Sequence, residues 1–129
     1  CVLKTDGNPF GHLVLRGGKL GPNYDSESVN KANHALVSGG LAKRLVIDCS
    51  HGNSNKDHNR QPIVFEDVVN QRVGGDSSIV GVMIESNINS GNQSLGKNPD
   101  SLEYGTSITD ACVGWSKTED MLVWASKTL

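Results

Sequence analysis

The chain has 129 residues, of which 20% are charged, and carries a formal net charge of -2. This length suits one domain, and the scattered Lys and Arg residues argue against the clustered positive charge by which proteins bind a nucleic-acid backbone. No stretch approaches the ~18 consecutive apolar residues of a membrane span and the start does not resemble a signal peptide, so we expect a cytoplasmic protein with no nucleic-acid or membrane partner.

The beginning of the chain predicts an arm rather than a core element. Residues 1–4 have the composition of a short strand, and the Asp-Gly and Asn-Pro pairs in residues 5–9 favour a turn. Residues 1–11 are therefore predicted to be part of a hairpin arm. The chain starts at a cysteine rather than Met, and its last helical pattern runs to the final residue, so we expect residues 1–129 to be a single partial domain of a longer protein.

The first predicted βα unit follows the arm. Residues 12–15 form an apolar strand that ends at Arg16, directly before two glycines that allow a sharp turn and a close approach to a ligand. A helix is predicted to begin after Asp25 or Ser26, either of which can cap it, and to stop at the glycine pair 39–40. The unit thus places a guanidinium at the tip of its strand.

The second predicted βα unit contains the most informative stretch, residues 44–55. Its strand is apolar at four positions without polar alternation, as expected of a strand covered on both faces. It ends in polar residues that include Asp48 and His51, followed by a polar loop. A helix is predicted over residues 62–73, with a proline in its first turn and glycines at its exit.

The third predicted βα unit has an unusually long loop. Residues 79–84 form an apolar strand that ends at Glu85, and the loop then runs from residue 87 to residue 115. Ordinary βα loops have about 2 to 6 residues, so a loop of this length indicates function or disorder. Ser116 and Glu119 are predicted to form a capping box that starts the final helix.

Three successive βα units predict an α/β fold with a parallel sheet, wound as an open sheet or as a barrel. Three units alone leave sheet edges and one face uncovered, which indicates missing strands. The cysteines are an odd number with neither zinc-ligand nor redox spacing, and we interpret all three as small buried apolar residues, at positions 1, 49 and 112.

Four chemically active side chains are predicted to share one edge of the sheet. Arg16, His51 and Glu85 are each the first strongly polar group after or near the end of an apolar strand, where ligands bind in barrels and doubly wound sheets. Asp110, in the long loop, can fold back over the same edge. An imidazole with two carboxylates suits a divalent metal such as Mn, Fe, Co or Zn, and an arginine suits a phosphate or carboxylate.

Each of these residues also has a purely structural interpretation. His51 can be a loop histidine with satisfied hydrogen bonds, Glu85 can cap a helix, and Arg16 can form an ion pair at the rim. Asp110 can serve as a turn or cap residue. Asp48 points away from its neighbours on the strand, either to support His51 or as a carboxylate inside a barrel.

Residues close to the predicted site also have two interpretations. Lys19, Asn23 and Tyr24 follow Arg16 and either line the same pocket or belong to a solvated loop. The remaining histidines, at positions 12, 34 and 58, are interpreted as structural or solvated.

Several motifs in this order resemble one enzyme family. They are LRGGK and PNY (15–19 and 22–24), IDCSHGNSNK (47–56), GVMIESN and GNQSL (81–87 and 91–95) and YGTSITDACVGW (104–115). Together they resemble the 3-deoxy-D-arabino-heptulosonate 7-phosphate (DAHP) synthases of class I, the aromatic-regulated type. The residues of the second and third motifs are similar to those of fungal members.

The resemblance implies a C-terminal portion of a (β/α)8 TIM barrel, about its last three βα units. It implies that His51, Glu85 and Asp110 are three of four ligands of a catalytic divalent metal and that Arg16 binds the phosphate of phosphoenolpyruvate. The fourth ligand in the family is a cysteine from an early strand, a place that no cysteine here occupies. The arm is similar to half of a hairpin that helps form a feedback site for an aromatic amino acid, and the complete protein is expected to be a homo-oligomer.

The implied reaction is an aldol-type condensation of phosphoenolpyruvate with erythrose 4-phosphate, which releases phosphate at the first step of aromatic amino-acid biosynthesis through the shikimate pathway. His51 or a metal-bound water would manage a proton when water adds. The isolated residues are expected to be inactive. Two alternatives stay open at this point: a metal-dependent hydrolase or lyase on a barrel, and a non-catalytic metal- or anion-binding module.

Overall fold

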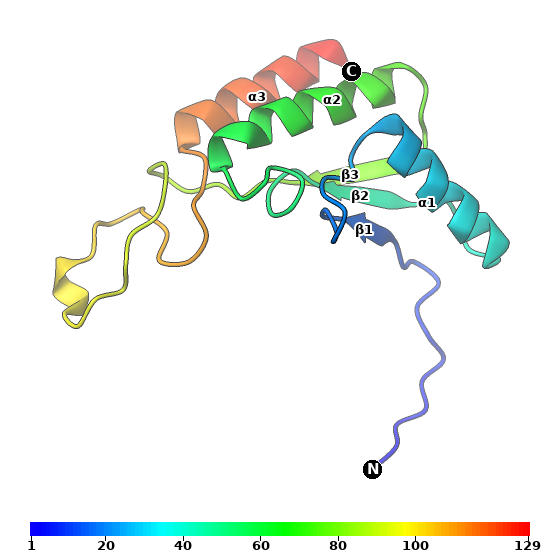
Figure 1. The fold of residues 1–129 in the computed structure, drawn as a ribbon, viewed down its shortest axis with the longest axis horizontal. Helices are drawn as coiled ribbons and strands as arrows, with labels where there is room; N and C mark the ends of the chain where they lie inside the picture. The colour runs from blue at the N-terminus through cyan, green and yellow to red at the C-terminus, as the bar shows by residue number, and fades with distance from the viewer.

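A three-stranded parallel sheet forms the centre of the structure, a computed structural model that describes residues 1–129. The strands are β1 (Leu13–Leu15), β2 (Leu45–Asp48) and β3 (Ile79–Met83), and they lie in the order β1-β2-β3. Both pairings are parallel, so the carboxyl ends of all three strands reach the same edge (Figure 1). The predicted α/β class and parallel sheet are confirmed.

Three helices pack on one side of this sheet. They are α1 (Ser26–Ser38), α2 (Gln61–Val73) and α3 (Trp115–Thr128), and Figure 1 shows α2 and α3 side by side above the strands. Apolar side chains from all three helices and all three strands form one buried cluster. None of the helices is long and apolar enough to span a membrane.

The predicted helix boundaries follow local chemistry. Asp25 is the N-cap of α1 and accepts a hydrogen bond from the backbone N of Ser28 at 2.9 Å. Hydrogen bonds from the Ser28 backbone N–H and the Ser28 hydroxyl hold the pKa of the Asp25 carboxyl below its usual range. Gly39 ends α1 and Gly74 ends α2, as predicted from the glycine pairs.

The apolar side chains of the edge strands are partly open to solvent. Val14 on β1 is 42% exposed, and Val80 and Val82 on β3 are 57% and 37% exposed. β1 and β3 each pair with β2 alone, so each has a free hydrogen-bonding edge. An apolar groove of about 380 Å³ also lies between β3, α2 and α3. The predicted uncovered edges are therefore present.

Three expectations from the sequence are wrong. Residues 1–4 do not form a strand, and residues 1–11 are exposed, with Val2 98% exposed (Figure 1); that residues 1–11 are part of a hairpin arm stays a prediction. Cys1 is exposed, whereas Cys49 and Cys112 are buried as predicted. The capping box of the last helix is absent, because α3 begins at Trp115 with Gly114 as N-cap and without a side-chain cap.

The long loop after β3 is ordered by its own hydrogen bonds. A short 3-10 helix (Pro99–Ser101) lies at its tip, and isolated bridges join Gly91 to Cys112 and Asn92 to Ser107. The Gln93 side chain bonds the backbone of Glu103 and Thr106 across the loop. The loop projects beyond the helices and then returns toward the sheet (Figure 1).

Candidate functional site

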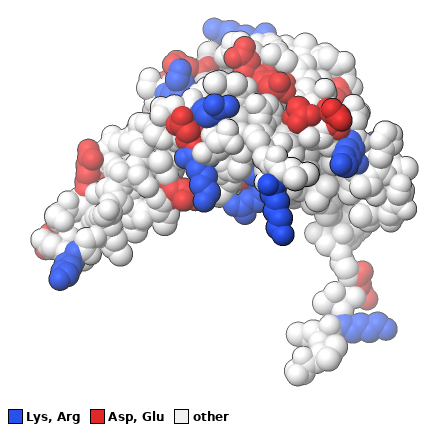
Figure 2. All heavy atoms as spheres, viewed as in Figure 1, with Lys and Arg blue, Asp and Glu red and all other residues white.

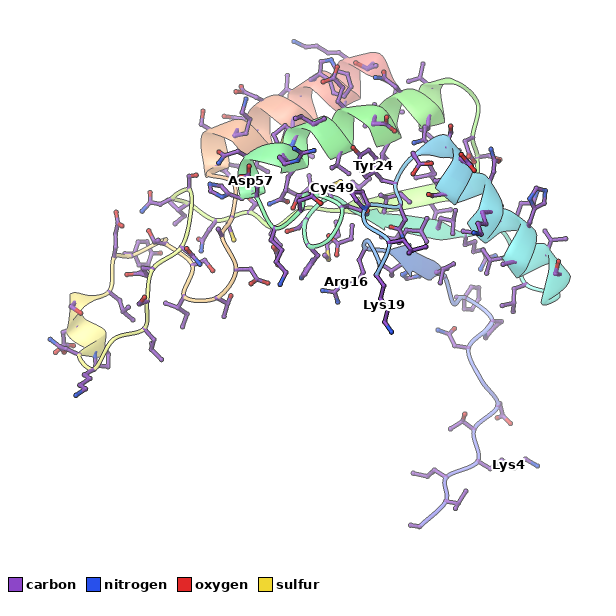
Figure 3. All side chains as sticks on the ribbon, in the orientation of Figure 1. Lys4, Arg16, Lys19, Tyr24, Cys49 and Asp57 are labelled. Carbon is purple, nitrogen blue, oxygen red and sulfur yellow. The ribbon has the colours of Figure 1, made fainter.

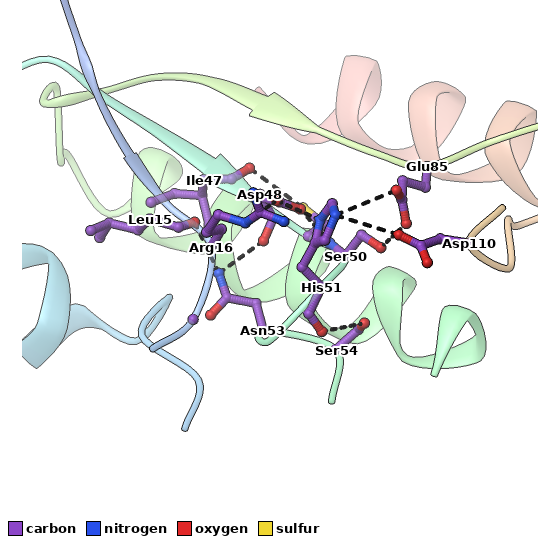
Figure 4. Close-up of polar contacts among 12 residues, drawn as sticks. Leu15, Arg16, Ile47, Asp48, Ser50, His51, Asn53, Ser54, Glu85 and Asp110 are labelled. Carbon is purple, nitrogen blue, oxygen red and sulfur yellow. Dashed lines mark hydrogen bonds and ion pairs between the residues drawn. The ribbon is translucent and has the colours of Figure 1, made fainter. Parts of the chain in front are cut away.

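The structure brings the four predicted groups together at the carboxyl edge of the sheet. Arg16 follows β1, His51 lies just after β2 and Glu85 just after β3, while Asp110 comes from the long loop (Figure 4). The Nε2 atom of His51 is 3.6 Å from Oε1 of Glu85 and 3.7 Å from Oδ2 of Asp110. One ligand atom from each of these three residues lies within 4.8 Å of the others.

A polar hollow of about 320 Å³ contains these groups. Its lining includes the carboxylates of Glu85 and Asp110 and the cations Arg16 and Lys56; Lys56 was not predicted. Figure 3 shows Arg16 and Lys19 extending to the same side, away from α2 and α3. Figure 2 shows basic and acidic side chains interspersed on this side of the molecule. A ligand here would meet both signs of charge.

The imidazole of His51 has carboxylates near both of its ring nitrogens. Its Nδ1 atom is 2.8 Å from Oδ2 of Asp48, whose side chain is only 1% exposed, and its Nε2 atom faces the other two carboxylates. The backbone of His51 has φ of 44°, an uncommon conformation for a residue other than glycine. His51, in the turn that follows β2, lines the hollow.

Glu85 is held at both its side chain and its backbone. The Ser50 hydroxyl donates to Oε2 of Glu85. The fully buried Gln61, at the start of α2, donates to the Glu85 carbonyl at 3.0 Å and accepts from its N–H at 2.8 Å. These hydrogen bonds fix the direction of the chain just after the end of β3.

The loops after β1 and β2 contact each other through their backbones. The N–H of Gly52 donates to the carbonyl of Arg16 at 3.0 Å. Gly17 has φ of 82°, and a Cβ there would lie 2.6 Å from the Gly52 carbonyl carbon. The buried Asn53 side chain adds hydrogen bonds to the ends of both strands, through the carbonyls of Leu15 and Asp48. The backbone segments that carry the Arg16 guanidinium and the His51 imidazole are therefore joined by hydrogen bonds.

The three ligand atoms fit a small metal ion. Ligands about 2.0–2.2 Å from a metal lie about 3.0–3.6 Å from one another, close to the distances around His51 Nε2. Burial raises the pKa of Cys49 to about 12, so its thiol stays protonated and does not offer a thiolate to the group. The group supplies one imidazole and two carboxylates, the donor set of a divalent transition metal.

The structure gives other roles to the residues that follow Arg16 and to His58. Lys19 does not line the hollow. Asn23 accepts from the N–H of Gly17 at 2.7 Å, and Tyr24 packs against the apolar core. His58 contacts the Ser90 hydroxyl at 3.1 Å, away from the hollow.

The sequence interpretation missed several residues that build the site. Ser50, Asn53, Lys56 and Gln61 all lie in or just after the polar loop that follows β2. Their composition indicated only a loop, because an amide that bonds distant backbone groups leaves no local pattern. Their closeness to His51 in the sequence was the one available signal.

Comparisons with known proteins point to a single family. Residues 1–123 match the model of the DAHP synthetase I family. The chain is 51% identical over 122 residues to the Tyr-sensitive phospho-2-dehydro-3-deoxyheptonate aldolase of Enterobacter agglomerans, covering 95% of this chain and 57% of that protein. It is 52% identical over 125 residues to the tyrosine-inhibited aldolase of Schizosaccharomyces pombe, with 95% and 34% covered.

Two further similarities agree with this match. The phenylalanine-inhibited aldolase of Saccharomyces cerevisiae is 49% identical over 128 residues, with 95% of this chain and 35% of that protein covered. The solved structure of the phospho-2-dehydro-3-deoxyheptonate aldolase from Francisella tularensis SCHU S4 superposes with a TM-score of 0.89 at 44% identity, over 96% of this chain and 36% of that chain. The chain thus spans from about a third to just over half of the length of these relatives.

Proposed function

The chain belongs to the DAHP synthetase I family, and from this premise we propose that the protein carrying it condenses phosphoenolpyruvate with erythrose 4-phosphate and water, forming DAHP and phosphate. This reaction is the first step of aromatic amino-acid biosynthesis. The observation that carries the proposal is the convergence of His51, Glu85 and Asp110 beside Arg16 in one polar hollow. A metal polarises a carbonyl oxygen, and a guanidinium binds phosphate, which are the two needs of this reaction.

We also propose that residues 1–129 form about the last three βα units of a (β/α)8 barrel. Two features of the chain support this arrangement. β1 and β3 have free edges, and the apolar groove between β3, α2 and α3 offers a surface for further strands and helices. The likeness to a solved family member extends over only 36% of that longer chain. The C-terminal position of these residues in the complete protein is part of the proposal.

In this proposal a divalent metal of the Mn, Fe, Co or Zn type is held by His51, Glu85 and Asp110, and it supplies a Lewis acid for the aldehyde oxygen of erythrose 4-phosphate. Arg16 orients phosphoenolpyruvate by binding its phosphate, because its side chain is 59% exposed and lines the hollow. Lys56 adds a second cation for the anionic substrates. Ser50 holds the Glu85 carboxylate in place.

We assign His51 the central catalytic position. Its Nε2 atom faces the carboxylates, and its Nδ1 atom faces Asp48. With both ring nitrogens directed at acidic groups, His51 contributes mainly by holding the metal and keeping it in position. Water and substrate reach it through the open part of the hollow, since the His51 side chain is 23% exposed.

The regulation and assembly of the complete protein are also proposals. Relatives are named as Tyr-sensitive, tyrosine-inhibited or phenylalanine-inhibited, which supports feedback inhibition by an aromatic amino acid. Residues 1–11 lie exposed at one end of the fold and are available to contact other parts of a larger protein. A homo-oligomer and a cytoplasmic location complete the proposal.

The proposal is tested by phosphate release. The complete protein, metal-free and then supplied with Mn²⁺, is assayed with phosphoenolpyruvate and erythrose 4-phosphate together and with each alone. We expect release that needs both substrates and the metal. Residues 1–129 expressed alone should give none, and turnover by them would refute the partial-barrel proposal. Absence of turnover by the complete protein under all metals of the series would refute the function.

A further inference from the structure

Asp48, the last residue of β2, carries a carboxylate that has no role among the metal- and phosphate-binding groups described above. Its side chain is 1% exposed, and three groups approach it. The backbone N–H of Ser50 donates to Oδ1 at 2.8 Å. The Nδ1 atom of His51 lies 2.8 Å from Oδ2, and the Nε atom of Arg16 lies 3.9 Å from the same oxygen (Figure 4).

The facing side-chain atoms of Asp48 and His51 can form hydrogen bonds only with each other. Oδ2 of Asp48 and Nδ1 of His51 are both buried, and neither has another hydrogen-bond partner. Although the two atoms are close, the contact is not well aligned as a hydrogen bond in this structure. An ionised carboxylate can only accept, so a favourable contact requires the imidazole proton to be on Nδ1. A buried carboxylate without such a donor would be costly.

We propose that Asp48 is a positioning residue: it keeps the proton of His51 on Nδ1, so that the lone pair of Nε2 is directed at Glu85 and Asp110 to bind the metal. A histidine that ligates a metal commonly donates its other N–H to a carboxylate, which fixes both the tautomer and the ring orientation. Arg16 supplies further positive charge on the same carboxylate. The inference rests on the proposed function only in its use of the metal.

The local backbone makes one substitution especially informative. In Asp48→Asn, the Ser50 N–H still requires an acceptor, so the amide oxygen keeps the Oδ1 position. The amide NH₂ then faces Nδ1 of His51 and favours the opposite tautomer, with the proton on Nε2. The ring would present a proton rather than a lone pair to the metal. Outer carboxylate partners of this kind typically contribute about 10- to 100-fold to metal affinity.

The first measurement needs no metal and no substitution at Asp48. The complete protein, labelled with ¹⁵N-histidine and kept metal-free, is examined by NMR for the tautomer of each imidazole, and His51 is assigned from a His51→Asn sample. We expect the Nδ1-protonated tautomer in the natural protein. A neutral His51 protonated on Nε2 would overturn the inference, whether or not the Asp48 variant folds.

The second measurement is Co²⁺ affinity, followed by visible absorption. We expect Asp48→Asn to bind Co²⁺ about 10- to 100-fold more weakly. Ile47→Val is the matched control, because Ile47 is the fully buried neighbour of Asp48 on β2 and does not line the hollow, so the change removes packing only. Equal Co²⁺ affinity of Asp48→Asn and the natural protein would overturn the inference. No Co²⁺ binding by the natural protein would instead count against the proposed function, and the tautomer would still decide the role of Asp48.

Discussion

Gln61 binds the backbone of Glu85 through both ends of its side-chain amide. The amide nitrogen donates to the Glu85 carbonyl at 3.0 Å, and the amide oxygen accepts from the Glu85 N–H at 2.8 Å. Gln61 is fully buried in the first turn of α2, so this contact ties a helix of the second βα unit to the end of the third strand. The position of a proposed metal ligand thus depends on a residue distant from it in sequence.

Gln61→Met should therefore weaken both the fold and the metal site. Methionine has a similar length but leaves the Glu85 N–H without its acceptor, while the Glu85 carbonyl keeps the N–H of Val113. A buried unpaired group costs about 1–3 kcal/mol, so we expect the complete protein to lose roughly 1–3 kcal/mol of unfolding free energy, measured in urea. Its Mn²⁺ affinity should also fall.

Gln71→Met is the matched control for this change. Gln71 lies on the same helix and also donates to a backbone carbonyl, that of Tyr24, but it does not line the hollow. It should destabilise the protein without changing Mn²⁺ affinity. Equal Mn²⁺ affinity of both variants would show that the Gln61 contact does not position Glu85.

The second prediction concerns the close backbone contact between Gly17 and Gly52. An alanine at position 17 would adopt an unfavourable positive φ, and its Cβ would lie 2.6 Å from the Gly52 backbone. We expect Gly17→Ala to destabilise the protein by roughly 2–5 kcal/mol. In Gly18→Ala a Cβ meets nothing within 4 Å, so its thermal midpoint should change little. Similar losses in both variants would contradict the contact.

The third prediction concerns the N-cap of α1. Replacing Asp25 by Ala removes the acceptor for the Ser28 N–H and should cost about 1 kcal/mol. Because the folded-state pKa of Asp25 is lowered, the charge-dependent part of this stability is present above the unfolded-state pKa and is lost as pH falls through the folded-state pKa. Asp25→Asn keeps a capping acceptor but should lose this pH dependence. Urea unfolding of the three proteins from neutral to acidic pH provides the measurement.

The elements that the sequence predicted well are those specified by local chemistry. The apolar strand before His51 and the helix ends at Gly39 and Gly74 depend on neighbouring residues alone, and each lies where expected. The gathering of Arg16, His51 and Glu85 followed from one rule, that parallel strands end at a common edge, whereas the place of Asp110 depended on how the long loop folds back. The identity of the family came from motifs rather than from this rule.

The features that the sequence did not predict depend on contacts between distant segments. The tail at residues 1–11 has strand-like composition but no partner strand, and composition alone cannot supply one. The start of α3 lies at Trp115 because the preceding residues bond to the end of β3 and to the loop, with Val113 N–H donating to the Glu85 carbonyl. The support from Gln61 and Asn53 likewise joins segments that a local pattern does not relate.

The fourth prediction concerns metal binding and needs no substrate. A metal that binds only the folded protein stabilises it by about 2.7 kcal/mol at 100 times its dissociation constant. Mn²⁺ should therefore raise the thermal midpoint of the metal-free complete protein, and EDTA should reverse the rise. Glu85→Gln should abolish most of it, while Glu119→Gln, on α3 and outside the hollow, should not. A similar rise in both variants would contradict the proposed ligand set.

The last prediction separates the proposed synthase from a metal-dependent hydrolase or lyase built on the same three ligands. Arg16 is a substrate-binding group only if the substrate carries a phosphate or carboxylate at that place, and a charge-assisted hydrogen bond of this kind contributes about 1.5–3 kcal/mol. Arg16→Ala in the complete protein should therefore lower kcat/KM for phosphoenolpyruvate by roughly 10- to 100-fold, with Mn²⁺ affinity nearly unchanged. Lys19→Ala, on the same side but outside the hollow, should leave kcat/KM unchanged. A metal-dependent rate that is insensitive to Arg16 would favour the hydrolase or lyase, because such chemistry requires no guanidinium at the end of β1.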